Sequence, residues 1–468
     1  MGPLVWMVAL LALDPVEEAR EVLERCAKEA EEQPRREEAI ALLGRIGSIR
    51  STRLLEALLA DPFPHIRDEA EWALTRCDAP SRAFLAEALA RRSDGMTRSH
   101  LARALGRIRD RSTLPALLDA LAIERDPALL PHLASAIGQF DEPAGLLALT
   151  EKAHRFPPGR AACIAGASAF PAAPEWALLY RADADDAVRA AVVDMLALHG
   201  REVLPDLESM DGVGERKGIA LAEALPKGRG RALVRRRAAA LLGHPSWRVR
   251  AAAISAVAAL HDASLLPDLR ARLEVEEGRL SEDLRAAMQR IDPRGGAGAE
   301  PEGRFAGVPL ASERIAIVVD LPGEVAAAGF GGWLASLRER QLIDLFRAED
   351  PGGFPPRVEV RRAFGGLMPP NADACVRWIA GQRGPSALFD ALAAAVEEEG
   401  IDTLCILSDG RMRRGSLRSC ERLCAEIERR NRWRRIRIHA LLVGGDVAVP
   451  EPLERLARGT GGSAKLLR

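Results

Sequence analysis

Apolar and polar positions alternate with a helical period through most of the chain, from about residue 14 to residue 292. The segments that show the pattern best have an arginine near their start, followed by alanine and larger apolar residues on one helical face. They are RREEAIALLGRIG, IRDEAEWALTRC, TRSHLARALGRIR, VRAAVVDMLALHG and VRAAAISAVAAL, which begin at residues 35, 66, 97, 188 and 249. These segments are copies of one unit, so the sequence predicts an internal repeat.

The arginine of each copy gives the register of the repeat. Successive copies lie about 30 residues apart, with Leu130 and Lys217 at the equivalent place in two weaker copies. An arginine at a turn can bond an aspartate or the carbonyl groups of the neighbouring repeat, and we favour this structural role over ligand binding. The arginines are Arg36, Arg67, Arg98, Arg160, Arg189, Arg250 and Arg285.

Two helices in about 30 residues, joined by turns such as ADPF at Ala60 and GHPS at Gly243, indicate an α-solenoid. The pattern resembles HEAT repeats, in the short form of bacterial lyase-associated proteins, from Asp14 to Asp292. The resemblance implies a long surface that holds another protein. We expect no enzyme activity, because the eight histidines have neither catalytic nor metal-binding spacing.

The texture changes after the repeats. Residues 293–312, PRGGAGAEPEGRFAGVPLAS, are rich in glycine and proline and lack periodicity, which predicts a flexible linker. Residues 313–468 then alternate strand and helix patterns, which predicts a doubly wound, mainly parallel α/β domain. Expected strands are RIAIVVD from Arg314, PRVEVRRAF as an edge strand, DTLCILSD from Asp402, RIRIHALLVG from Arg435 and SAKLLR at the end, and residues 332–348 are among the expected helices.

Oxygen-bearing residues follow the strands of this second domain. Asp320 and Asp409 each end a strand, and Ser386 precedes the helix in GPSALFDAL. This order resembles a von Willebrand factor type A (VWA) domain, a resemblance that covers nearly the whole segment. In that family, a metal-ion-dependent adhesion site is built from D-x-S-x-S, a threonine and a later aspartate, and it binds Mg²⁺.

The resemblance implies Asp320, Ser386 and Asp409 as site residues, but the segment DLPGE departs from the family pattern. Pro322 removes one hydroxyl ligand, and Glu324 stands in place of the second serine. Two interpretations remain open. In one, the site binds Mg²⁺ or Mn²⁺ with Glu324 as a replacement ligand; in the other, which we favour, the site is degenerate and metal-free.

A local basic segment follows the LSDG loop. From Arg411 to Arg437 there are eleven arginines and three glutamates. We favour a solvated outer helix, but binding of RNA or another nucleic acid is the alternative, because Ro RNA-binding proteins also join a HEAT-type array to a VWA domain. The candidate contacts are Arg411, Arg413, Arg414, Arg430, Arg432, Trp433, Arg434 and Arg435.

Composition limits the function classes further. The formal net charge of -1 argues against nucleic-acid or membrane binding by the whole chain. Residues 1–13 are interpreted either as a degenerate signal peptide or as a first buried helix, so the sequence is compatible with a cytoplasmic or an exported protein. The interpretation that we favour is a non-enzymatic scaffold for another protein, with no transmembrane segment and with no cofactor established.

Overall fold

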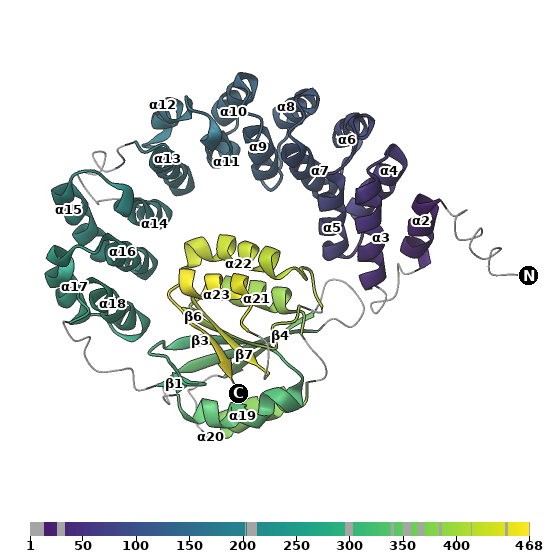
Figure 1. Cartoon of the computed structure of the whole chain (residues 1–468). Helices are drawn as coiled ribbons and strands as arrows, with labels where there is room; N and C mark the ends of the chain where they lie inside the picture. Colours follow the sequence, from purple (N-terminus) through teal and green to yellow (C-terminus); the bar gives the residue numbers. More distant parts are fainter. Residues whose placement is uncertain are drawn as a thin grey trace, which may run out of the picture. The chain divides into compact units, whose positions relative to one another are not determined.

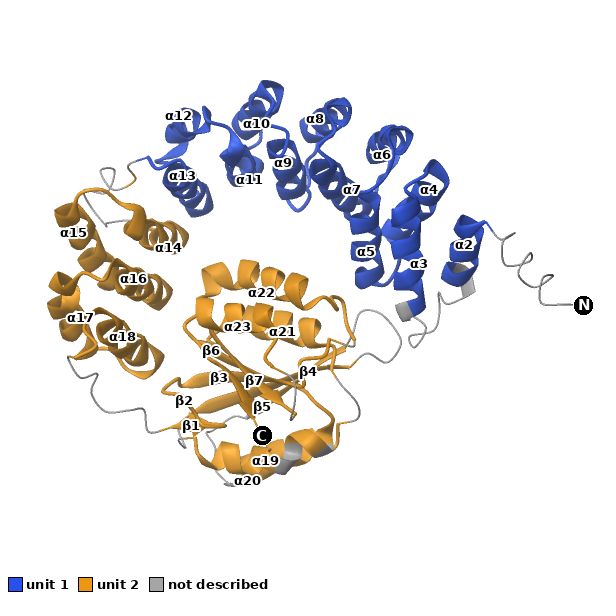
Figure 2. Cartoon of the chain, viewed as in Figure 1, with its two compact units in different colours: residues 1–201 blue, residues 202–468 orange. Residues whose placement is uncertain are grey.

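The computed structural model describes residues 14–25, 33–201, 203, 213–294, 303–337, 341–349, 357–363, 369–382, 386–412, 414–444 and 448–467. The predicted signal or first helix at 1–13 lies outside these residues. The chain divides into two compact units, residues 1–201 and 202–468 (Figure 2). No described helix is long and apolar enough to cross a lipid bilayer.

The first unit consists of antiparallel helices in two layers, preceded by α2 (Pro15–Arg25) (Figure 1). The helices of the inner layer pack on one another in order, as do α4, α6, α8 and α10 of the outer layer, and the two layers pack together. The inner layer contains α3 (Gln33–Ile46), α5 (Pro64–Leu74), α7 (Gly95–Ile108), α9 (Leu130–Gly138), α11 (Arg160–Gly166) and α13 (Asp186–Leu198). The outer layer contains α4 (Ile49–Ala57), α6 (Ala79–Arg91), α8 (Leu114–Ile123), α10 (Pro143–Arg155) and α12 (Ala173–Ala177).

Small residues allow the inner helices to approach closely. A Cβ atom added at Gly106 on α7 would lie 2.7 Å from the Cα of Ala136 on α9, closer than real Cβ atoms come. A Cβ at Gly44 on α3 would likewise lie 2.8 Å from the Cβ of Ala73 on α5. The alanine and glycine positions of the repeat therefore set the distance between neighbouring repeats.

The second unit begins with further helices of the same kind and ends with the sheet domain. Its helices are α14 (Glu215–Ala224), α15 (Arg231–Leu242), α16 (Trp247–Leu260), α17 (Leu266–Leu273) and α18 (Gly278–Ile291). Helices α14, α16 and α18 form the layer that faces the sheet domain, and α15 and α17 form the other layer (Figure 1). The last of these helices ends at Ile291.

The main sheet has six strands in the order β5-β4-β3-β6-β7-β8, all parallel except β5, which is antiparallel to β4. One face packs against α21 (Leu388–Glu397), α22 (Cys420–Arg434) and α23 (Glu451–Gly459), and the other against α19 (Gly323–Ala335) and α20 (Pro369–Ala380). The strands are β3 (Arg314–Asp320), β4 (Leu342–Glu349), β5 (Arg357–Ala363), β6 (Thr403–Ser408), β7 (Arg437–Val443) and β8 (Ala464–Leu467). This arrangement is a doubly wound sheet whose strand order reverses between β3 and β6.

The predicted helix at 332–348 is wrong in its second half. Helix α19 ends at Ala335, and Leu342–Glu349 forms strand β4 next to the central strand. Ile343 and Leu345 enter the core on one face of the sheet, while Phe346 and Ala348 enter the core on the other. A strand buried on both faces lacks the alternation of apolar and polar residues that marks a strand with one solvent-facing side. The apolar pattern of β4 was therefore assigned to a helix.

The structure also shortens the predicted flexible linker at 293–312. Arg304–Phe305 (β1) and Val308–Pro309 (β2) pair as a small antiparallel hairpin. Phe305, Val308 and Leu310 are buried in the same core as β3 and α19, so this part of the segment belongs to the sheet domain. The high glycine and proline content predicted a linker, although the apolar residues between the glycines form this hairpin.

Candidate functional site

Two of the site residues predicted from the sequence, Asp320 and Ser386, lie close to one another at the carboxyl end of β3. Asp320 is the last residue of β3, and its side chain is buried. Its Oδ2 accepts a hydrogen bond from the Ser408 hydroxyl (2.8 Å), and its Oδ1 accepts one from the backbone N–H of Ser386 (2.9 Å). Asp320 and Ser386 therefore meet at the switch point of the sheet, where ligands bind in open α/β folds.

The hydroxyl group of Ser386 is engaged by the end of strand β4. It accepts a hydrogen bond from the backbone N–H of Ala348 (2.9 Å) and lies 3.1 Å from the carbonyl oxygen of Ala348, to which it donates. The side chain thus extends the edge of β4 by one pair of hydrogen bonds. These two bonds fix the position of the hydroxyl group and leave it one unused lone pair.

Asp409 lies beyond β6 and is only half-buried. Its Oδ1 accepts a hydrogen bond from the backbone N–H of Arg411 (3.0 Å), which forms a turn after the strand. The backbone of Glu324 lies in α19, but its side chain is outside the described residues, so its predicted role as a ligand is not addressed.

The electrostatics of this edge are those of a buried acid. Burial and the nearby carboxylate of Asp409 together raise the pKa of Asp320 to about 7, although the hydrogen bond from Ser408 lowers it. Arg347, buried on β4, donates to the carbonyl oxygen of Leu321 (3.0 Å), and its positive charge also lowers this pKa. The carboxyl group of Asp320 is thus held by hydrogen bonds from Ser408 and Ser386, and Pro322 offers no side-chain oxygen at this edge.

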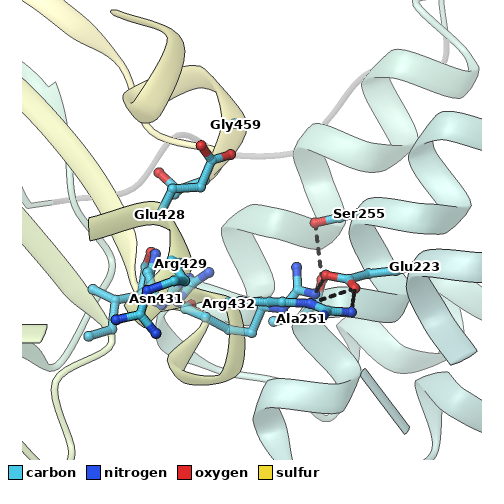
Figure 3. Close-up of a pocket in the computed structure, with 12 residues that line it drawn as sticks. Glu223, Ala251, Ser255, Glu428, Arg429, Asn431, Arg432 and Gly459 are labelled. Atoms are coloured by element: carbon cyan, nitrogen blue, oxygen red, sulfur yellow. Dashed lines mark hydrogen bonds and ion pairs between the residues drawn. The ribbon is translucent and has the colours of Figure 1, made fainter. Parts of the chain in front are cut away.

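The basic segment contacts the terminal repeats within the second unit. Glu223, at the end of α14, pairs with Arg432 (2.7 Å between Oε2 and Nη2) and with Arg435 (Figure 3). The guanidinium of Arg432 also lies over the ring of Trp433, 4.2 Å from its centroid. Three of the predicted nucleic-acid contacts are thus used for packing inside the chain.

Two further arginines of the segment bond within the sheet domain. Arg430 pairs with Glu397 (2.6 Å) and Glu426 (2.8 Å), and Arg434 donates to the carbonyl oxygens of Val396, Glu397 and Glu398. Arg411 and Arg414 lie in the loop after β6, and Arg413 is outside the described residues. Arg430, Arg432, Arg434 and Arg435 thereby fix α22 in place.

A second group of ion pairs joins α18 to the sheet domain, and sequence reasoning missed it. The buried Arg437 of β7 pairs with both Glu282 and Asp283. The buried Arg279 pairs with Asp283 (3.2 Å) and donates to the carbonyl oxygens of Asp402 (2.7 Å) and Arg435. Arg279 therefore caps carbonyl groups that precede β6 and β7, and together the two arginines hold α18 against the sheet domain.

The repeat arginines have the geometry of turn supports. Arg36 pairs with Asp61 in the next turn, and Arg67 donates to the carbonyl oxygen of the same Asp61 (2.6 Å). Arg98 pairs with Glu124 (2.6 Å). Arg160 pairs with Asp183, Arg189 bonds the carbonyl oxygens of Asp183 and Ala184, and Arg250 bonds those of His244 and Pro245. Arg285 differs, because it bonds the hydroxyl of Ser281 within its own helix α18.

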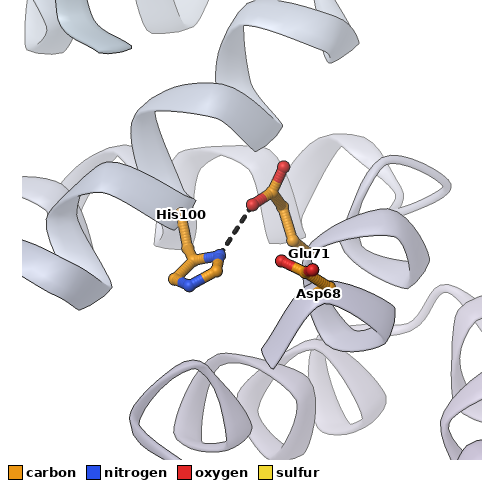
Figure 4. A group of neighbouring side chains, drawn as sticks. All are labelled: Asp68, Glu71 and His100. Carbon is orange, nitrogen blue, oxygen red and sulfur yellow. Dashed lines mark hydrogen bonds and ion pairs between the residues drawn. The ribbon is translucent and has the colours of Figure 1, made fainter. Parts of the chain in front are cut away.

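A polar cluster on α5 and α7 was also missed. Ligand atoms of Asp68, Glu71 and His100 lie within 4.8 Å of one another (Figure 4). Glu71 accepts hydrogen bonds from His100 Nδ1 (2.7 Å) and Arg103 (2.7 Å) and pairs with Arg107. Two arginines already neutralise this site, so it is an ion-pair network rather than a metal centre. The one sequence signal was the spacing from Glu71 to His100, which equals about one repeat.

Residues 82–166 match the family model for HEAT repeats. The helical region contains HEAT repeats. The matched segment covers α7 to α11 and most of α6, and the same two-layer arrangement extends on both sides of it. The predicted solenoid is confirmed, together with a mostly parallel sheet at the C-terminal end.

None of the curated protein sequences is significantly similar to this chain. Among solved structures, human deoxyhypusine hydroxylase in complex with glycerol is 17% identical, with a TM-score of 0.26 over 54% of this chain and 99% of that one. An engineered protein is also 17% identical, with a TM-score of 0.28 over 60% of this chain and 89% of that one. These scores are too low to support a conclusion about function.

Proposed function

We propose that the protein is a non-enzymatic scaffold that binds other proteins through the inner layer of its HEAT repeats. The observation that supports this most strongly is the contact inside the second unit, where α14, α16 and α18 already hold a folded domain. That contact uses Glu223, Arg279 and Glu282 of the inner layer against arginines and carbonyl groups of the sheet domain. Repeats of the same build in the first unit offer the equivalent surface to a partner.

The first unit has a suitable anchor on α5. Trp72 is 43% exposed, although large apolar side chains are mostly buried, and the guanidinium of Arg107 lies over its ring at 4.4 Å from the centroid. Tryptophan and arginine are the residues most enriched among those that dominate binding energy at protein interfaces. The polar network of Glu71 and Arg103 beside them fixes the positions of these side chains.

Replacing Trp72 by alanine is expected to weaken partner binding by about 2 kcal/mol, roughly thirtyfold, because a central aromatic anchor is lost. The measurement is quantitative affinity capture by the full-length chain from the cells that produce it, followed by a binding titration with the retained protein. Leu147→Ala on α10 is the matched control, since Leu147 is 62% exposed on the outer layer. Equal retention by wild type and Trp72→Ala would exclude this face, and retention of nothing above background would exclude the scaffold.

We further propose that the C-terminal domain is a VWA-type domain whose carboxyl edge works without a divalent cation. The strand order and the switch point at Asp320 support the domain type. Pro322, which has no hydroxyl group, and the buried, hydrogen-bonded carboxyl group of Asp320 support an edge without a cation. Calorimetric titration of Mg²⁺ or Mn²⁺ into the full-length chain is then expected to give no saturable heat, with Asp409→Ala indistinguishable from wild type. A saturable 1:1 isotherm that Asp409→Ala abolishes would establish a metal site.

Nucleic-acid binding through 411–437 is the alternative. It would require Arg432 and Arg435 to leave Glu223, and Arg430 to leave Glu397 and Glu426. The contacts of these arginines therefore support a role within the chain.

A further inference from the structure

The second unit contains a cavity of about 500 Å³ between its terminal helices and the edge of the sheet. Ile254 and Ala258 of α16 and Val308 of the β1–β2 hairpin give it an apolar part. Residues of α18, of β7 and of the loop before β8 give it a polar part. A cavity of this volume, with an apolar wall and a few polar groups, has the build of a small-molecule site.

Positively charged side chains around the cavity outnumber the carboxylates that pair with them. Arg437 and Arg279 are matched by Glu282 and Asp283, and Arg458 is matched by Glu454. Arg285 and Arg290, which also line the cavity, have no carboxylate partner among the described residues. The hydrogen bond of Arg285 is to the Ser281 hydroxyl, at 3.1 Å. Two guanidinium charges at the cavity are therefore left for a ligand.

A buried histidine adds an unused hydrogen-bond donor. His439 on β7 lines the cavity and is 4% exposed. Its Nδ1 accepts a hydrogen bond from the backbone N–H of Ser463 (3.2 Å), so in the neutral ring the proton is on Nε2. Burial, with the charges of Arg437 and Arg279, lowers the pKa of His439 to about 3 and keeps the ring neutral. Nε2 is buried and has no hydrogen-bond partner among the residues that the structure describes.

We propose that this cavity binds a small molecule with a phosphate monoester group, held by Arg285 and Arg290, with Nε2–H of His439 as a further donor. A phosphate monoester carries a charge of about −1.5 to −2 at pH 7, which matches the two uncompensated arginines. Guanidinium groups bind phosphate oxygens through paired hydrogen bonds. The apolar wall at Ile254 and Val308 accommodates the organic part of the ligand. This site is independent of the protein-binding face on α5 and α7.

Isothermal titration calorimetry on the full-length chain tests the proposal, with phenyl phosphate, inorganic phosphate and benzoate as probes. Phenyl phosphate is expected to bind 1:1 and more tightly than inorganic phosphate, because only the ester reaches the apolar wall. Arg285→Gln/Arg290→Gln is expected to weaken this binding at least tenfold, and His439→Phe severalfold. Arg229→Gln/Arg270→Gln removes the same charge from exposed positions that do not line the cavity, and it should bind like wild type.

Three results would overturn the proposal. Absence of saturable heat with both phosphate probes would exclude the site. Equal weakening by the two double variants would reduce it to general charge attraction, and benzoate binding as tight as phenyl phosphate would assign it to carboxylates instead. Thermal melting followed by circular dichroism shows whether each variant is folded. A second measurement needs no variant: in the wild type, inorganic phosphate should protect Arg285 and Arg290 from a reagent that modifies guanidinium groups.

Discussion

Replacing Arg437 by methionine is expected to lower the free energy of unfolding of the second unit by about 3–5 kcal/mol. Arg437 is the shared partner of Glu282 and Asp283, and both it and Glu282 are buried. Methionine fills a similar volume but cannot pair with the carboxylates of Glu282 and Asp283, which remain poorly hydrated. Breaking one partner of a buried ion pair costs more than the pair contributes, because a desolvated charge remains. Urea unfolding of the full-length chain, monitored by tryptophan fluorescence, measures the change.

Two controls define that result. Glu282→Gln/Asp283→Asn/Arg437→Met removes both sides of the network, so part of the lost stability should return. Arg458→Met breaks an exposed pair with Glu454 on the same domain and should cost less than about 1 kcal/mol. If Arg437→Met and Arg458→Met cost the same, the ion pairs between α18 and β7 do not stabilise the unit.

Replacing Glu71 by glutamine is expected to cost the first unit about 3–5 kcal/mol for a similar reason. The Glu71 carboxylate is buried between His100, Arg103 and Arg107. Burial alone would raise its pKa, but hydrogen bonds from His100 and Arg103 and the arginine charges outweigh it and hold the pKa at about 2. The ionised form is therefore the one that the folded state stabilises.

The direction of this pKa shift determines how the contribution of Glu71 to stability depends on pH. Because the folded pKa lies below the ordinary value of 4.5, the contribution of Glu71 is fully present above about pH 4.5 and is lost as the pH falls toward 2. The shift corresponds to about 3 kcal/mol. Acid unfolding followed by circular dichroism should show that Glu71→Gln loses part of the wild-type pH dependence in this window. Glu38→Gln, at an exposed position on α3, is the control, and an unchanged acid transition in Glu71→Gln would contradict the account.

The sequence predicted the repeats and most of the sheet because these depend on local periodicity. RIAIVVD and DTLCILSD formed the central strands β3 and β6, and PRVEVRRAF formed the edge strand β5. The prediction failed for β4, where burial on both faces removed the alternation, and for the β1–β2 hairpin, where glycine and proline suggested a linker. In each case the deciding contacts come from elsewhere in the chain.

The candidate sites could be predicted only in part, because hydrogen-bond partners depend on distant residues. The order of Asp320, Ser386 and Asp409 placed them at one edge of the sheet, and the structure brings Asp320 and Ser386 together. No local pattern indicated that Ala348 would engage the Ser386 hydroxyl. The same holds for Arg432, whose partner Glu223 lies 209 residues away in the sequence. From the sequence, the arginine-rich segment therefore left a solvated outer helix and a nucleic-acid surface as the two interpretations, and neither included its contact with α14.

The central claim is that the inner layer of the repeats binds a folded domain, and hydrogen exchange of the full-length chain tests it most directly. Glu223→Arg places a positive charge opposite Arg432 and Arg435, while Glu274→Arg makes the same charge change at an exposed position just after α17. We predict that Glu223→Arg speeds amide exchange in α14 and α22 at least tenfold while the central strands β3 and β6 stay protected, and that Glu274→Arg exchanges like wild type. Unchanged protection of α14 and α22 in Glu223→Arg would contradict the claim.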